Sequence, residues 1–272
     1  MMGGEVLRGC GKLRRIEALV DIHSHILPGL DDGAKSLDES VAMIRMAVEA
    51  GTTDIVATPH ANDRYAYDPE MVDAKIAELK AACSGMRIHR GCDFHMSYGN
   101  VQDALQNPTK YTINGGSYLL IEFPEMVIAP NISAVLDQLH SVGIIPIVTH
   151  PERNPVIQKK LSMLMEWVDR DCLVQVTASS FLGRFGRAAA KSAGELMARD
   201  LVHVVASDAH DTRYRTTALD AAYGYIAKHY SAEHAETVLV RNPGAIISGG
   251  YVDTGGLVGT PRRTPLWRRF LR

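Results

Sequence analysis

Cysteine is scarce in this chain of 272 residues, and none of its four cysteines belongs to a recognisable motif. The four are Cys10, Cys83, Cys92 and Cys172. None forms a C-x-x-C pair, which argues against a zinc ribbon or a thioredoxin-type site. None is followed six residues later by arginine, so the C-x5-R pattern of a thiolate-dependent site is absent. We therefore expect no catalysis that depends on a cysteine nucleophile.

Three further absences limit where the protein works and what it binds. The chain has no apolar run as long as a membrane span, so we expect it not to cross a bilayer. Residues 1–15 lack the apolar core of a secretory signal, which favours a cytoplasmic protein. A net charge of −2 argues against a general nucleic-acid binder. The remaining composition, 46% hydrophobic and 22% charged, is ordinary for a soluble globular protein, and it leaves the oligomeric state open.

Seven short apolar runs, nearly all separated by segments with a helical apolar face, are predicted to be strands. They cover residues 18–22, 54–58, 86–91, 118–123, 144–149, 173–177 and 201–207. A capping box at Ser36 and Glu39 begins the first helix, and Gly51 ends it. Residues 96–117 are expected to be irregular, apart from one helical turn around residues 101–105.

The order of these elements predicts the fold class. Strands that alternate with helices form parallel sheets, and nearly continuous apolar strands are buried on both faces. We therefore predict an α/β protein with one (β/α) barrel domain, in which the carboxyl ends of all strands share one face. An open doubly wound sheet is the alternative, but ligands from so many strands could not easily converge along a line. The domain is expected to span residues 18–250, between a flexible extension at 1–17 and a basic tail at 251–272.

Histidines and carboxylates stand at or just after the ends of most predicted strands. The first strand leads into His23-Ser24-His25, whose imidazoles lie two residues apart, point to one side and can share a metal ion. Two ordinary loop histidines would explain this motif alone, but four later strands end in the same way. The full set of candidate ligands is His23, His25, Asp32, His60, Asp93, Glu122, His150, Asp208 and His210.

This set of ligands is too large for one ion, which takes roughly four to six. Imidazole and carboxylate without thiolate favour a cluster of roughly two or three ions of manganese, iron or zinc. Clustered divalent ions polarise a phosphoryl oxygen and activate water, so the set suits hydrolysis of a phosphate ester by direct attack of water. Arg153 shares a loop with His150, and Arg215 shares one with His210, so both guanidinium groups are candidates to bind the phosphate.

The other histidines that we considered fall outside this pattern and are expected to be ordinary. They are His89, His95, His140, His203 and His229. His95 lies close enough to Asp93 in the sequence to serve as a spare ligand.

Six motifs together resemble one protein superfamily. They are Asp21-Ile22-His23-Ser24-His25, Asp31-Asp32-Gly33, Thr58-Pro59-His60, Ile121-Glu122-Phe123, His150-Pro151-Glu152-Arg153 and Ala206-Ser207-Asp208-Ala209-His210. The combination runs in order through residues 19–250 and resembles the PHP (polymerase and histidinol phosphatase) superfamily. More closely, it resembles the bacterial protein-tyrosine phosphatases of the CpsB/YwqE type, which are encoded with capsule and exopolysaccharide genes. The resemblance implies a distorted (β/α)7 TIM-like barrel with a trinuclear, manganese-dependent site.

The resemblance also implies an activity and a partner. Proteins of this type dephosphorylate the tyrosine-rich tail of a membrane-bound autokinase that controls polysaccharide export. All the candidate ligands except Asp93 match the metal ligands of the family, and Arg153 and Arg215 match its phosphate-side arginines. Asp208 and His210 are in addition the candidates to assist the leaving group. The chain departs from the family at Asp93, where a glutamate one methylene longer usually bridges two ions.

Two other functions fit the same motifs. One is a small-molecule phosphoesterase such as a histidinol phosphatase, with the same metals and a different pocket. The other is a barrel weakened at Asp93 that binds the kinase tail as a regulator without turnover. Retention of the other eight candidate ligands and of both arginines argues against the second of these.

Overall fold

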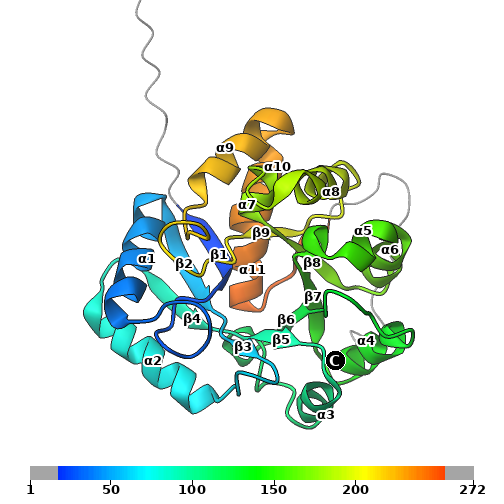
Figure 1. The fold of residues 1–272 in the computed structure, drawn as a ribbon, viewed down its shortest axis with the longest axis horizontal. Helices are drawn as coiled ribbons and strands as arrows, with labels where there is room; N and C mark the ends of the chain where they lie inside the picture. Colours follow the sequence, from blue (N-terminus) through cyan, green and yellow to red (C-terminus); the bar gives the residue numbers. More distant parts are fainter. Residues whose placement is uncertain (1–17, 255–272) are drawn as a thin grey trace, which may run out of the picture.

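Parallel strands form the centre of the molecule, and helices surround them (Figure 1). The computed structural model describes residues 18–254, so the predicted N-terminal extension and the tail from residue 255 lie outside the described residues. The strands are β1 (Leu19–Ser24), β2 (Thr52–Ala57), β3 (His60–Ala61), β4 (Arg87–Arg90), β5 (Asp93–His95), β6 (Tyr118–Glu122), β7 (Ile145–Thr149), β8 (Leu173–Thr177) and β9 (Val204–Ala206). Each pair of neighbours among them is parallel, as the sequence predicts.

Two of the predicted strands continue after a break, which is why the described residues contain nine strands rather than seven. β3 follows β2 across Pro59, which has no N–H to donate to a neighbouring strand. β5 follows β4 across Gly91, where a Cβ atom would lie 2.7 Å from Cγ1 of Val56. The breaks divide the strands into two sheets, ordered β1-β2-β4 and β3-β5-β6-β7-β8-β9. They account for the distortion of the barrel.

The first and last strands meet and close the ring. Ser24 and Ala209 form an isolated parallel bridge, and the N–H of His25 donates to the carbonyl of Ala209 at 2.8 Å. Between the same two segments, the carboxylate of Asp21 accepts a hydrogen bond from the N–H of Ser207 at 3.0 Å. The predicted α/β barrel is therefore confirmed, and an open doubly wound sheet is excluded.

Helices and short helical turns connect the strands and cover their outer side. The helices are α1 (Leu37–Glu49), α2 (Pro69–Ala82), α3 (Tyr98–Gln106), α4 (Ile132–Ser141), α5 (Pro155–Lys159), α6 (Leu161–Asp169), α7 (Ala178–Phe181), α8 (Gly186–Ala198), α9 (Asp220–His229), α10 (Ala232–Glu236) and α11 (Asn242–Ser248), with turns η1 (Ile113–Gly115), η2 (Pro151–Arg153) and η3 (Thr237–Arg241). The side chain of Ser36 caps α1 by accepting from the N–H of Glu39, as the capping box predicts. Within the part of the chain that the structure describes, no helix is both long and apolar enough to cross a bilayer.

The segment at residues 96–117 differs from the expected irregular loop. It contains α3, a helix of nine residues whose N-terminus is capped by Ser97. Val101 and Ala104 are its buried residues. An apolar face of this size is too small to show a clear helical period in the sequence.

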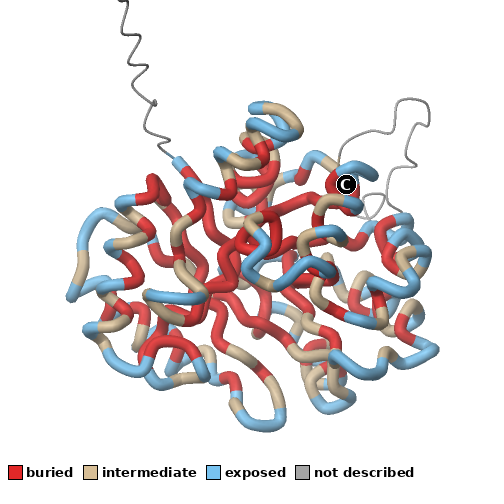
Figure 2. The backbone as a smooth tube through the Cα atoms, turned by 45° about the horizontal axis from the view of Figure 1, so that its top comes forward, coloured by how far each residue is buried: buried red, intermediate tan, exposed pale blue. Residues whose placement is uncertain are grey.

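Two hydrophobic clusters form the core, and the buried backbone lies at the centre of the molecule (Figure 2). The larger cluster packs the helices against the outer side of the strands. The smaller one fills the barrel interior with side chains such as Ile22, Leu120 and Ile147. Ile246 of α11 and Val252 belong to this inner cluster, so α11 and the segment after it close one end of the barrel. Polar residues lie at the other end of the barrel.

Candidate metal centre

The two-residue period of the strands changes the barrel interior from apolar to polar. On β6, Tyr118 and Leu120 belong to the inner hydrophobic cluster, and Glu122 follows at the next inward position. On β8, Leu173 belongs to the same cluster, and Gln175 follows it. The polar residues therefore collect at the carboxyl ends of the strands, the face where barrel enzymes build their active sites.

His23 and His25 form the centre of this polar layer. Both side chains are buried, and their Nε2 atoms lie 3.3 Å apart. Nδ1 of His23 lies 2.9 Å from Oε1 of Gln175, and Nδ1 of His25 lies 2.7 Å from Oδ2 of Asp31. Each Nδ1 can therefore keep its proton and donate it, which leaves the Nε2 lone pairs facing one another. Two facing lone pairs suit a shared cation.

Asp93 lies among three imidazoles. Its Oδ2 is 3.1 Å from Nδ1 of His60, 3.5 Å from Nε2 of His23 and 4.0 Å from Nε2 of His25. The carboxyl group is buried, and these imidazoles are its partners among the described residues. Burial raises its pKa, but His23 and His60 outweigh this effect and hold the pKa well below its usual value. A buried carboxylate surrounded by imidazole nitrogens fits a metal-binding role.

Three overlapping groups of side chains have the spacing of metal ligands. In each group, one potential ligand atom per residue lies within 4.8 Å of the others. The groups are His25, Asp32, His60 and His210; His23, His25 and Asp93; and His60, Asp93 and Glu122. His25, His60 and Asp93 each belong to two groups. Shared ligands of this kind fit a cluster of ions better than a single ion.

Asp208 is the meeting point of both candidate arginines. Its Oδ2 lies 2.7 Å from Nη2 of Arg153 and 2.5 Å from Nη2 of Arg215, while Oδ1 lies 3.5 Å from the Nε2 atoms of His23 and His25. Burial opposes ionisation, but Arg153 and His23 hold the pKa of Asp208 well below its usual value. The carboxylate thus faces the imidazoles on one side and the guanidinium groups on the other.

His150 completes the set of predicted ligands. Its Nε2 lies 3.6 Å from Oε1 of Glu122. Burial lowers the pKa of His150 well below the usual value for histidine. The residue has a φ of 35°, a left-handed conformation that is strained for histidine. The loop is held by Glu152, whose Oε1 accepts from the N–H of Thr177 at 3.1 Å and from Oγ of Ser180 at 2.7 Å.

A cavity of about 550 Å³ opens onto this cluster. All the candidate ligands except His23 and His25 line it, and so do Arg153 and Arg215. The side chain of Asp32 is 53% exposed, whereas those of His23 and His25 are buried behind the cavity. The structure thus brings together every residue that the sequence singles out, although their roles as ligands and phosphate binders stay predictions.

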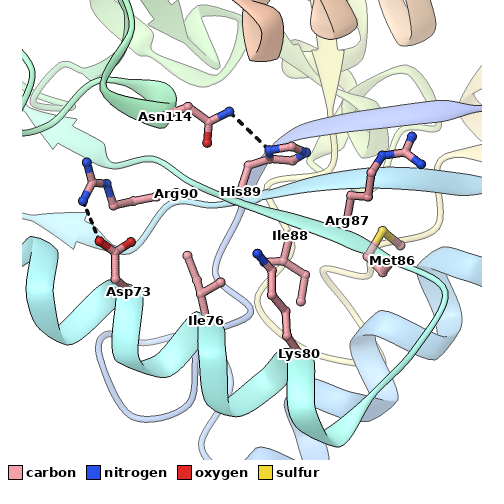
Figure 3. Close-up of a pocket in the computed structure, with 9 residues that line it drawn as sticks. All are labelled: Asp73, Ile76, Lys80, Met86, Arg87, Ile88, His89, Arg90 and Asn114. Carbon is pink, nitrogen blue, oxygen red and sulfur yellow. Dashed lines mark hydrogen bonds and ion pairs between the residues drawn. The ribbon is translucent and has the colours of Figure 1, made fainter.

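The other histidines mostly lie elsewhere. His95 is near enough to contact the cluster, since its Nδ1 lies 3.8 Å from Oε2 of Glu122. His89 lies beside a different hollow of about 640 Å³ between α2 and β4 (Figure 3). There Arg90 pairs with Asp73 at 2.8 Å, and His89 pairs with Asp54 at 3.0 Å. Because these charges are already paired and no metal-type group lines this hollow among the described residues, we do not regard it as the active site.

Sequence reasoning missed the residues that hold the ligands in place. Asp31 and Gln175 orient two imidazoles, and Glu152 anchors the loop that carries His150. Asp31 stands beside Asp32 in a recognised motif, so the sequence could have indicated its role. Nothing in the sequence indicated the role of Gln175, because it lies within a predicted strand. The same holds for Phe185, which lines the cavity but lies in no motif.

Comparisons with known proteins agree with this geometry. The family model described as "Capsular polysaccharide synthesis, CpsB/CapC" matches residues 19–248, which include β1 to α11 and every candidate ligand. The chain belongs to the CpsB/CapC family. CapC of Staphylococcus aureus is 38% identical to it over 202 residues, covering 72% of this chain and 79% of CapC. The tyrosine-protein phosphatase YwqE of Bacillus subtilis is 33% identical over 220 residues, covering 79% of this chain and 86% of YwqE.

A solved structure of the CpsB/CapC family supports the same conclusion. It comes from a crystallographic description of YwqE from Bacillus subtilis and CpsB from Streptococcus pneumoniae as metal-dependent tyrosine phosphatases. The match has a TM-score of 0.79 at 30% sequence identity and covers 86% of this chain and 96% of the other. The barrel found here is therefore the barrel of this family.

Proposed function

We propose that this protein is a metal-dependent protein-tyrosine phosphatase. The observation that carries the proposal is one cavity lined by both a candidate metal cluster and two arginines that share Asp208. The membership of the CpsB/CapC family supports it, since YwqE and CpsB are named tyrosine-protein phosphatases. The positions of the thiols support it as well, because none of the described cysteines lines the cavity.

The metal is proposed to be manganese, with roughly two or three ions and with iron or zinc as alternatives. The residues that would hold it are His23, His25, Asp32, His60, Asp93, Glu122, His150, Asp208 and His210. Bound divalent ions would polarise a phosphoryl oxygen and lower the pKa of water, the attacking nucleophile. The buried carboxylate of Asp93, which lies among three imidazoles, and the facing imidazoles of His23 and His25 fit this group.

The protein's own residues would position the ester. Arg153 and Arg215 reach the cavity from two loops, so both can bind the phosphoryl oxygens and offset their charge. Of the two candidates to assist departure of the leaving group, His210 fits better, because Asp208 stays ionised beside both arginines and has no proton to donate. A phenolate, whose conjugate acid has a pKa of about 10, needs little of this help, whereas an alkoxide needs much more. The site should therefore favour aryl over alkyl phosphates.

The proposed physiological substrate is phosphotyrosine on the tail of a bacterial tyrosine autokinase of polysaccharide export, met in the cytoplasm. A flexible peptide can reach a cavity that opens at the rim of the barrel. The exposure of Asp32 at this rim supports such access. The link to capsule synthesis rests on the family and on nothing in the cavity itself.

One set of assays tests the proposal. Matched peptides that carry phosphotyrosine or phosphoserine are compared with histidinol phosphate, each with and without manganese. We expect kcat/KM to be highest for phosphotyrosine and to depend on the metal. Equal values for the two peptides, or a preference for histidinol phosphate, would reduce the assignment to a metal-dependent phosphoesterase. Binding of the peptide without turnover would instead make the protein a regulator.

A further inference from the structure

Phe185 is a half-buried aromatic residue that lines the cavity without joining the hydrophobic core. It belongs to neither hydrophobic cluster of the described residues, nor to the apolar side chains packed against them. Its ring instead faces two cations. Cζ of Arg153 lies 4.5 Å from the ring centroid, and Cζ of Arg215 lies 5.9 Å from it.

We propose that Phe185 is a positioning residue whose ring holds Arg153 and Arg215 in the orientation that binds the phosphoryl group. This inference rests on the proposed function of the two arginines. It assigns a role to a residue that no motif contains and that contacts the substrate phosphate only through the guanidinium groups.

Two glycines and a backbone hydrogen bond shape the turn that carries Phe185. Gly183 and Gly186 flank it with φ values of 75° and 84°, and a Cβ atom at either glycine would meet nothing within 4 Å. Glycine is therefore required there by the left-handed backbone and not by crowding. The N–H of Arg184 donates to the carbonyl of Ser179 at 3.0 Å, and this bond closes the turn against α7.

The turn that carries Phe185 and the loop that carries Arg153 share one anchor. Glu152 is fully buried, and its Oε1 accepts hydrogen bonds from the N–H of Thr177 and from Oγ of Ser180. Glu152 is adjacent to Arg153 in the chain, and Ser180 begins the segment that leads to Phe185. A buried contact therefore links the segment that leads to Phe185 with the loop that carries Arg153.

The ring of Phe185 adds an attraction for the two guanidinium groups to that of the Asp208 carboxylate. Both guanidinium groups approach the same carboxylate oxygen, so their like charges repel one another. The electron-rich face of an aromatic ring attracts cations without occupying the N–H donors in the guanidinium plane. When a phosphate ester enters, the arginines can turn these donors from Asp208 to the phosphoryl oxygens while the ring keeps both cations nearby.

The test compares Phe185→Leu, which keeps the bulk and loses the aromatic face, with Phe185→Tyr, which keeps the face. Both are loaded with manganese, and binding of inorganic phosphate is measured by calorimetry beside KM and kcat for a phosphotyrosine peptide. Tyr214→Leu is the matched control, because this aromatic side chain is 79% exposed in the loop that carries Arg215. Metal content and Tm are recorded for every variant.

We expect Phe185→Leu to weaken phosphate binding and to raise KM by about 2- to 30-fold, the range of a cation–π contact. Metal content and Tm should stay at the wild-type values, and Phe185→Tyr and the control should bind phosphate as the wild type does. Unchanged phosphate binding in Phe185→Leu overturns the proposal, and a loss confined to aryl substrates would mean that the ring contacts the ester itself. Lost metal, a lowered Tm, or no rescue by tyrosine would also overturn it. Inorganic phosphate is a ligand whichever ester is the substrate, so failure of the tyrosine assignment would leave this result readable.

Discussion

The side-chain carbonyl of Gln175 lies 2.9 Å from Nδ1 of His23, and both residues are completely buried inside the barrel. Gln175 comes from β8 and His23 from β1, so one hydrogen bond links two distant strands. Its consequence is chemical as well as structural. An Nδ1 that donates to Gln175 leaves Nε2 free to bind a metal, so the glutamine selects the tautomer that a ligand needs.

This relationship predicts the effect of removing the glutamine. Gln175→Leu should lower metal affinity by about 10- to 100-fold, as loss of a residue that orients a ligand commonly does. Isothermal titration of manganese into the metal-free protein measures the change. Gln138→Leu, an exposed position on α4, serves as the control. Wild-type affinity in Gln175→Leu would show that His23 is oriented by packing alone.

A second prediction separates metal chemistry from thiol chemistry. Burial raises the pKa of the thiols of Cys92 and Cys172, and the thiol of Cys83 has a raised pKa too, so all three are poor nucleophiles. Treatment with EDTA should abolish hydrolysis, and iodoacetamide should change its rate by less than about twofold. Rates on a phosphotyrosine peptide before and after each treatment decide the matter. Strong inactivation by the alkylating agent would refute the prediction.

A third prediction concerns the two arginines. Arg153→Ala and Arg215→Ala should each lower kcat/KM by about 100- to 1000-fold, because each removes a donor for the charge on the phosphoryl group. Guanidinium does not bind metal ions, so elemental analysis should find metal content near that of the wild type. Arg213→Ala, an exposed arginine in the same loop as Arg215, should leave both quantities unchanged. Loss of metal from either variant would show that the arginines support the cluster through Asp208.

A fourth prediction concerns the shorter carboxylate at position 93. Asp93→Glu should raise kcat, since a longer side chain can bridge two ions without a shift of the strand. The carboxylate of Asp93 contacts the imidazoles of other candidate ligands, and a longer carboxylate can still reach them. Elemental analysis and steady-state rates with manganese measure the effect, with Asp93→Asn as a control that should lose metal. If metal content and rate both fall in Asp93→Glu, the strand β5 has adapted to aspartate.

The sequence predicted the barrel and the membership of the cluster because both follow from local patterns. Apolar strands that lead into His60, Glu122 or Asp208 indicate the polar face from the sequence alone. The breaks within the barrel were not predictable, since they depend on how closely Gly91 approaches Val56 on a neighbouring strand. α3 was missed because its buried face consists of two residues.

The supporting residues of the site could not be predicted for a related reason. Gln175 resembles any polar residue in a strand until β8 is placed near β1, with only β9 between them. Phe185 resembles a core aromatic residue until its ring is seen beside two guanidinium groups. Such roles depend on contacts between distant segments, which neither periodicity nor spacing encodes.

The closure of the barrel between β1 and β9 has a consequence for how the protein is made. Asp21 and Ser207 are hydrogen-bonded across a separation of 186 residues, and the cluster combines His23 with Asp208 from these same two regions. A chain still emerging from the ribosome lacks Asp208 and His210 until the segment that includes β9 has been made. Contacts of such long range form late in folding, so metal uptake and activity should appear together as one final event of synthesis. A nascent chain that lacks β9 should therefore be inactive.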